Sequence, residues 1–245
     1  MTLRRTRATA LRVLRQLRHD PRTIALLLAV PCVLQILVRA LFDDRPAVFQ
    51  SLGVPLLGLF PFVAMFIVTS ITMLRERVSG TLERLMTTPL ARGDLLVGYA
   101  LAFALVAAAQ ATLVSILSFG LLGLESGHPP VSVVALAIAN ALLGMALGLF
   151  ASAFARTEFQ AVQFMPAFVL PQILLCGLIV PRDEMAEWLQ VIASVMPLTY
   201  AYDALAQLAS PDELTARFWA DVTVVAAVTV LALSLGAVTL KRRTP

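Results

Sequence analysis

The sequence is poor in charged residues and almost without lysine. Only 14% of its 245 residues are charged, and Lys241 is the single lysine. A phosphate-binding loop of the form G-x-x-x-x-G-K-[ST] needs a lysine followed by serine or threonine, whereas Lys241 is followed by Arg242. The chain therefore lacks the loop that ATP hydrolysis would need. We expect it to be no enzyme and to bind no cofactor of its own.

Cysteine and histidine are equally scarce, with two of each. Cys32 and Cys176 both fall inside apolar runs, where buried inert thiols are the usual outcome, so we expect neither a disulfide nor a metal site. His19 and His128 are isolated, on opposite sides of the predicted membrane, which predicts ordinary interfacial residues. No nucleophile or acid–base set suggests a membrane-embedded enzyme.

Apolar residues are abundant, at 59% of the chain with a mean hydropathy of +0.86. They form long runs of the length that a helix needs to cross a bilayer, about 20 residues. The runs lie at approximately 23–42, 52–74, 95–122, 131–154, 161–180 and 219–240. This pattern predicts an all-α integral membrane protein with six transmembrane helices.

The basic residues are distributed unevenly along this layout. Fifteen of the 19 fall on the side that carries both termini. Basic residues mark the cytoplasmic side of a membrane protein, so we expect both the N- and C-termini to be cytoplasmic. The pI near 9.7 then reflects membrane topology, and we expect no nucleic-acid partner.

Residues 1–22 form a separate unit ahead of the six-helix domain at 23–245. On a helical wheel, one face is apolar and the other carries arginines. The apolar face holds Leu3, Ala10, Val13, Leu14 and Leu17, and the basic face holds Arg4, Arg5, Arg12, Arg15 and Arg22. We expect an amphipathic helix on the inner membrane surface. The simpler alternative is a tail that only sets topology.

A short polar segment, VSGTLERLMTTP at 78–89, separates two apolar runs. Its Ser-Gly pair can start a helix, and its Thr-Pro pair would end that helix after about two turns. Leu82, Leu85 and Met86 then form one apolar strip. Because so short a helix is unstable alone in water, it should dock against another surface. That surface is either a partner or, alternatively, its own protein or the lipid headgroups.

Two stretches carry a family resemblance. RERVSGTLERLMTTPLARGDLLVGYALA, at 75–102, resembles the cytoplasmic loop of type-2 ATP-binding-cassette (ABC) export permeases, and MPLTYAYDAL, at 196–205, is similar to their segment after span 5. The six-span layout and the basic N-terminus agree. One departure is Tyr99, where many relatives have Lys or Arg, so an ionic role at this position is in doubt.

The resemblance implies a transmembrane subunit that dimerises with an identical or closely paralogous copy. Each copy would couple to a separate cytoplasmic ABC ATPase, which binds ATP and Mg, so two ATPase copies are expected. A coupling helix at 81–87, within a loop at about 75–94, would seat in the ATPase, and a smaller contact is expected at 155–158. The implied coupling residues are Arg75, Glu76, Arg77, Gly80, Thr81, Leu82, Glu83, Arg84, Leu85, Met86, Pro89 and Arg156.

Polar residues inside apolar runs are costly and often mark a transport pathway. The candidates for a substrate path are Gln35, Gln110, Asn140, Gln163 and Gln172. Asn140 also begins a stripe of small residues, spaced by four, that favours close helix packing over substrate contact. Two prolines at 166 and 171 should kink the fifth span, and short external helices are expected at about 181–217.

The resemblance implies the permease subunit of an exporter in a bacterial inner membrane, and the short external loops favour a hydrophobic small molecule such as a drug, antibiotic or lipid as cargo. Export of a polysaccharide or glycolipid is the alternative within the family. A secondary transporter that needs no ATPase is the alternative outside it. That alternative predicts inverted repeats and acids deep in a span, and neither is evident.

Overall fold

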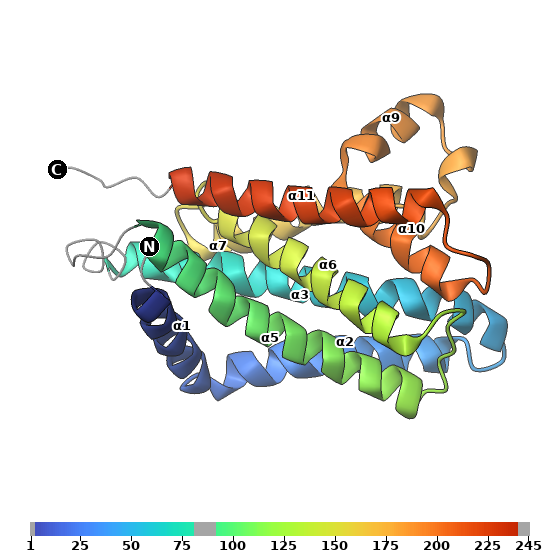
Figure 1. Ribbon diagram of the computed structural model, residues 1–245, viewed down its shortest axis with the longest axis horizontal. Coiled ribbons are helices and arrows are strands. Elements are labelled where there is room, and N and C mark those ends of the chain that lie inside the picture. Colours follow the sequence, from blue (N-terminus) through green and yellow to red (C-terminus); the bar gives the residue numbers. More distant parts are fainter. Residues whose placement is uncertain (1–2, 81–91, 240–245) are drawn as a thin grey trace.

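The computed structural model describes residues 3–80 and 92–239, in which long helices run side by side along one axis (Figure 1). These helices are α2 (Pro21–Leu41), α3 (Pro46–Val78), α5 (Arg92–Gly120), α6 (Pro130–Ala151) and α11 (Ala216–Thr239), and α1 (Leu3–Arg18) precedes them. Shorter elements follow α6: α7 (Glu158–Phe164), the π-helix η1 (Met165–Val169), α8 (Leu170–Leu175), the 3-10 turn η2 (Arg182–Glu184), α9 (Glu187–Val195) and α10 (Pro197–Ala209).

Proline fixes where several of these helices begin. Helices α2, α3, α6 and α10 each have a proline in the first turn. Proline has no backbone N–H to leave unpaired there, and its φ angle already suits a helix. At α2, Asp20 adds a side-chain cap, since its carboxylate accepts from the Thr23 backbone N–H at 3.2 Å and the Thr23 hydroxyl at 2.6 Å. The chain therefore turns sharply between α1 and α2.

Five described helices are long and apolar enough to cross a membrane: α2, α3, residues 97–120 of α5, α6 and α11. They confirm a helical, multi-pass membrane protein. The expected span at 161–180 has a different form, because α7, η1 and α8 divide it and its helical part ends at Leu175. The π-helical turn contains Pro166, which has no N–H to donate, so the predicted irregularity is confirmed at this position. The prediction of six transmembrane helices is met by five among the described residues.

Helices α3 and α6 form the centre of the bundle, and glycine brings them together. A Cβ atom added to Gly144 would lie 2.2 Å from the backbone oxygen of Phe62, and one added to Gly148 would lie 2.4 Å from that of Phe66. The Thr69 hydroxyl on α3 also lies 3.2 Å from the Met145 carbonyl on α6. The small-residue stripe of α6 is therefore a packing surface, as its spacing predicted.

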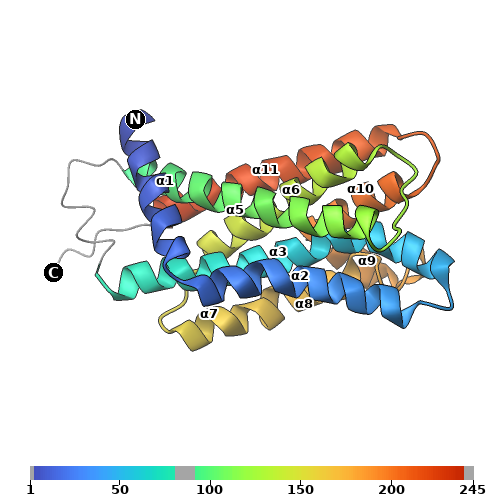
Figure 2. The same cartoon turned by 90° about the horizontal axis from the view of Figure 1, so that it is seen from below.

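Helix α1 lies crosswise at one end of the bundle (Figure 2). This α1 end also holds the end of α3, the starts of α5 and α7, and the ends of α6 and α11 (Figure 1). The predicted helix within residues 1–22 is confirmed over 3–18. Its apolar face is not turned to lipid as expected, because Ala10, Val13 and Leu17 are buried and Thr9 packs closely against Gly98 of α5.

The opposite end, here called the α9 end, holds the helices expected between 181 and 217. The first, α9, begins at Glu187 and not at 181, because residues 182–184 form a 3-10 turn. Trp188, Val191 and Val195 on α9 are exposed. The second, α10, buries Ala204 and Leu205 with α3 and α6 residues, so it belongs to the bundle core and is not a peripheral cover.

Candidate functional site

The candidate site lies at the α1 end, where α3 leaves the bundle. Three of the predicted coupling residues, Arg75, Glu76 and Arg77, occupy the last turns of α3, one turn beyond the expected end of that span. Gly80 follows with φ +69°, a left-handed conformation that suits glycine, and its N–H donates to the Arg77 carbonyl at 3.3 Å. Gly80 therefore follows the end of α3, at Val78, in a conformation that does not continue the helix.

The other predicted coupling residues of this loop lie outside the described residues. They are Thr81, Leu82, Glu83, Arg84, Leu85, Met86 and Pro89. The described part of the site is the frame to which this segment is attached at both ends, α3 before it and α5 after it.

Arg75 and Glu158 pair across the gap between α3 and α7. The Arg75 Nε and Nη2 atoms donate to the two Glu158 carboxylate oxygens at 2.8 and 3.0 Å. Both side chains are exposed, and the hydrogen bond from Arg75 holds the pKa of Glu158 below its usual value. This bidentate geometry fixes the orientation of the two groups as well as their distance. It joins the two segments that the sequence predicts as partner contacts.

The loop before α7 is ordered by local hydrogen bonds. The Thr157 hydroxyl accepts from the Gln160 backbone N–H at 3.2 Å and so caps α7. The Gln160 side chain reaches back to accept from the Arg156 backbone N–H at 2.8 Å. These bonds place Arg156 and Glu158 beside the end of α3.

Glu76 is buried on the other side of α3, where α1 and α5 meet it. Only 2% of its side chain is exposed, and its carboxylate lies 3.6 Å from Arg12 of α1. Arg12 also donates to the Tyr99 hydroxyl on α5, with its guanidinium over the tyrosine ring. Tyr99 thus takes part in a charged cluster as a neutral acceptor, which answers the doubt about its role. Arg12, Glu76 and Tyr99 link three helices.

Arg77 connects α3 to α6. Its Nη1 atom lies 3.4 Å from the Ser152 carbonyl, just after the last turn of α6. The three consecutive residues Arg75, Glu76 and Arg77 therefore face α7, α1 and α6 respectively. A displacement of this turn of α3 would act on each of these neighbours.

A cavity of about 640 Å³ opens at this point. Its lining comes from α1, α3 and the loop before α7, and it is both charged and apolar. The lining residues are Gln16, Leu74, Arg75, Glu76, Val78, Ser79, Arg156, Thr157 and Glu158. A groove of this composition can receive a short helix or side chains of a partner protein.

The candidate substrate-path residues do not gather in one place. Gln35 donates to the Gly53 carbonyl at 3.1 Å, and Gln110 donates to the Leu27 carbonyl at 2.5 Å, so each joins α2 to a neighbouring helix. Asn140 is buried beside Gly58. Gln172 accepts from the Leu198 N–H at 3.3 Å, whereas Gln163 is exposed on α7. Their role in a substrate path stays a prediction.

Sequence reasoning named Arg12 and Tyr99 but did not place them together at this site, and it missed an acid in the last span. Arg12 looked like one of several arginines on a polar face, because a wheel does not show what packs against it. Asp221 lies in the second turn of α11 with 3% of its surface exposed, close enough to Arg217 and Asp203 to interact electrostatically. The only available signal was its position just inside an apolar run.

The fold and the site define a multi-pass helical membrane protein with a polar contact region at one end. Residues 4–209 match the model of the ABC-2 type transporter family, and the chain belongs to that family. It is 29% identical over 167 residues to the probable multidrug ABC transporter permease YbhR of Escherichia coli, covering 67% of this chain and 45% of that protein. It is 28% identical over 137 residues to the linearmycin resistance permease protein LnrN of Bacillus subtilis, covering 56% of this chain and 35% of that protein.

A more distant relative is ABC transporter G family member 20 of Dictyostelium discoideum, 24% identical over 147 residues. That alignment covers 60% of this chain and 20% of the relative. The chain thus spans less than half the length of these curated relatives.

Proposed function

We propose that this chain is the permease subunit of an ATP-driven exporter, coupled to a separate ABC ATPase that binds ATP and Mg. The family supports a transport role, and the missing phosphate-binding loop supports a separate motor. The observation that carries the assignment is the Arg75–Glu158 pair. The pair holds the end of α3 next to the second predicted contact segment. Both lie beside a cavity of about 640 Å³, and such a fixed arrangement is suited to binding a partner.

In this proposal, the segment 81–89 contacts the ATPase through Leu82, Leu85 and Met86. A push on that segment reaches α3, a continuous helix of 33 residues that runs the length of the bundle. Because α3 and α6 touch backbone to backbone, they move together as a packed unit. Arg12 of α1 contacts Glu76 of α3 and Tyr99 of α5, so α1 and α5 would move together with α3.

We place the α1 end in the cytoplasm of a bacterium, with the bundle in its inner membrane. Those described basic residues that the sequence assigns to the cytoplasmic side lie in segments gathered at this end. Both termini would then be cytoplasmic, with the predicted span at 161–180 forming a sixth, irregular crossing. Two permease copies, identical or closely paralogous, would associate with two ATPase copies.

The proposed cargo is a hydrophobic small molecule. This inference rests on the relatives named as a multidrug permease and a linearmycin resistance permease. Expression of the chain with its ATPase should lower the accumulation of such compounds in cells. Unchanged accumulation, together with altered surface polysaccharide, would favour the polysaccharide alternative.

The direct test is co-purification with the ABC ATPase encoded beside this chain. Replacing Leu85 and Met86 with aspartate should abolish co-purification while the permease still inserts in the membrane, because two charges cannot enter an apolar contact without a large desolvation cost. Leu121→Asp is the matched control, since Leu121 is exposed at the α9 end. Retained co-purification of the double variant would contradict the coupling assignment.

A further inference from the structure

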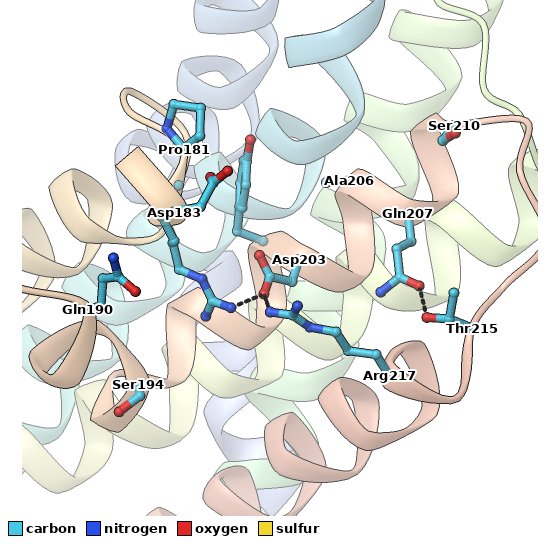
Figure 3. A pocket seen from close by; sticks show the side chains of 13 residues that line it. Pro181, Asp183, Gln190, Ser194, Asp203, Ala206, Gln207, Ser210, Thr215 and Arg217 are labelled. Carbon is cyan, nitrogen blue, oxygen red and sulfur yellow. Dashed lines mark hydrogen bonds and ion pairs between the residues drawn. The ribbon is translucent and has the colours of Figure 1, made fainter. Parts of the chain in front are cut away.

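A second cavity, of about 870 Å³, lies at the α9 end and has no part in the coupling site. It is walled by the chain around 177–183, by α9 and α10, and by the start of α11 (Figure 3). Its volume falls in the range of sites that hold small molecules, about 300–1,000 Å³. The polar side chains that line the cavity determine which class of ligand it can bind.

Two arginines converge on one acid in this wall. The Arg182 and Arg217 Nη2 atoms lie 3.2 and 2.9 Å from the same Asp203 oxygen, Oδ2 (Figure 3). A guanidinium carries five N–H donors, and each arginine uses one nitrogen for this acid. Each guanidinium therefore keeps further N–H donors for an incoming anion, although Asp183 also lines the cavity and Asp221 interacts electrostatically with both arginines.

The cavity wall carries charges of both signs. Among the described residues, the basic side chains of the α9 end are Arg39, Arg45, Arg182 and Arg217, and the last two line the cavity together with the acids Asp183 and Asp203. Burial raises the pKa of Asp203, and the two arginines oppose that shift. Asp203 thus competes with an incoming anion for the same two guanidinium groups.

An apolar surface adjoins this polar wall. The side chains of Trp188, Val191 and Val195 are 65%, 66% and 78% exposed on one face of α9, the helix that supplies Gln190 and Ser194 to the cavity. Ile179, near the wall residue Pro181, is also exposed. A tryptophan beside aliphatic side chains is typical of the membrane–water interface. The ligand that fits both surfaces has an anionic head and a hydrocarbon tail.

We propose that this cavity binds the phosphate headgroup of a membrane lipid, with Arg182 and Arg217 contacting the phosphate and the exposed face of α9 contacting the acyl chains. Arginine suits phosphate because its planar donors can pair with two oxygens at once. Asp203 holds the two arginines in place when no lipid is bound and weakens lipid binding by competing for them.

Lipid binding to the purified full-length chain tests this site, with native mass spectrometry as the readout and dioleoylphosphatidylglycerol as the probe. The double variant Arg182→Gln/Arg217→Gln should lose at least about tenfold in affinity, because both charged hydrogen bonds to phosphate disappear. Arg45→Gln makes the same chemical change on an exposed arginine at the same end and should alter affinity by less than about twofold. Equal binding by the double variant and the wild type would overturn the site.

Asp203→Asn separates recognition from structural support. Removing the competing charge should strengthen phosphatidylglycerol binding, whereas the arginine variant weakens it. If the three residues only held the wall together, both variants would weaken binding, and that result would contradict the proposal. Circular dichroism and gel filtration of each variant check that the fold is retained.

Two further ligands distinguish the headgroup from the tail. Dioleoylglycerol has the same acyl chains without phosphate and should not compete, so competition equal to that of phosphatidylglycerol would overturn the assignment. Inorganic phosphate tests the head alone. Competition by it would show that the phosphate group suffices, and arginine-dependent lipid binding without such competition would show that the acyl chains also contribute.

Discussion

Arg75 at the end of α3 and Glu158 at the start of α7 form a bidentate ion pair, with N–O distances of 2.8 and 3.0 Å. The pair joins segments that are far apart in the sequence, and both residues line the cavity at the α1 end. Because both side chains are exposed, the pair contributes little to stability, typically about 0–1 kcal/mol. Its more important effect is to fix the position of the 155–158 loop relative to α3.

Charge reversal tests this positional role. Arg75→Glu and Glu158→Arg should each weaken association with the ATPase, because each places like charges side by side, and the double variant should recover most of the loss. Co-purification measures the effect. Arg39→Glu, which disrupts the exposed Arg39–Asp43 pair at the α9 end, should leave association unchanged. Failure of the double variant to recover would mean that the two residues act separately.

The Arg75–Glu158 pair should also give stability a particular dependence on pH. The hydrogen bond from Arg75 lowers the pKa of Glu158, so the folded chain binds the proton less readily than the unfolded chain. The contribution is therefore present above the ordinary glutamate pKa, about 4.3, and disappears as pH falls through the lowered value. The difference in unfolding midpoint between wild type and Glu158→Gln should be seen at pH 7 and vanish in acid. A difference that grows in acid would contradict this assignment.

The buried carboxylate of Glu76 depends on its partner Arg12 more strongly than the exposed Glu158 depends on Arg75. Arg12→Ala would leave a carboxylate that is 2% exposed without its cation, so we expect the free energy of unfolding to fall by about 1–3 kcal/mol. Adding Glu76→Gln to Arg12→Ala should restore part of this loss, because the uncompensated charge is removed. Thermal unfolding in detergent measures both. Arg15→Ala, on the exposed side of α1, is the matched control, and an equal loss there would refute the role of the pair.

The sequence predicted most of the helices because hydrocarbon runs and prolines are local signals. The apolar runs match α2, α3, α5, α6 and α11, and proline starts several of them. The pattern could not predict the form of the run at 161–180, since whether a proline breaks a helix into a π-helical turn depends on what packs around it. The sequence also could not show whether the apolar face of α1 contacts lipid or protein, because both environments favour the same apolar residues.

The polar site was predictable only in part, for the same reason. Arg75, Glu76 and Arg77 were found because a motif contains them. Their partners Arg12 and Tyr99 lie on other helices, so only the packing of three helices brings them together. The partners of Asp203 could not be predicted either, because Arg182 lies in the 3-10 turn η2 and Arg217 lies on α11. Pairing at such sequence separations leaves no periodic signal.

Close contact between α3 and α6 predicts a strong effect of a single methyl group. Gly144→Ala places a Cβ atom 2.2 Å from the Phe62 carbonyl oxygen, so the helices must separate. We expect a loss of about 1–3 kcal/mol in the free energy of unfolding, the usual cost of overpacking. Gly120→Ala is the control, because no atom lies within 4 Å of the added carbon. Equal unfolding midpoints for the two variants would show that the helices do not pack this closely.

Cysteine labelling in cells tests the orientation of the bundle. In a background with Cys32→Ala and Cys176→Ala, Glu125→Cys places a thiol at the α9 end and Ser79→Cys places one at the α1 end, both at exposed positions. The excess of arginine at the α1 end predicts that a membrane-impermeant maleimide will label position 125 in intact cells. Position 79 should react only after the membrane is permeabilised. The reverse pattern would invert the proposed topology, and with it the side from which an ATPase can reach the segment that follows Gly80.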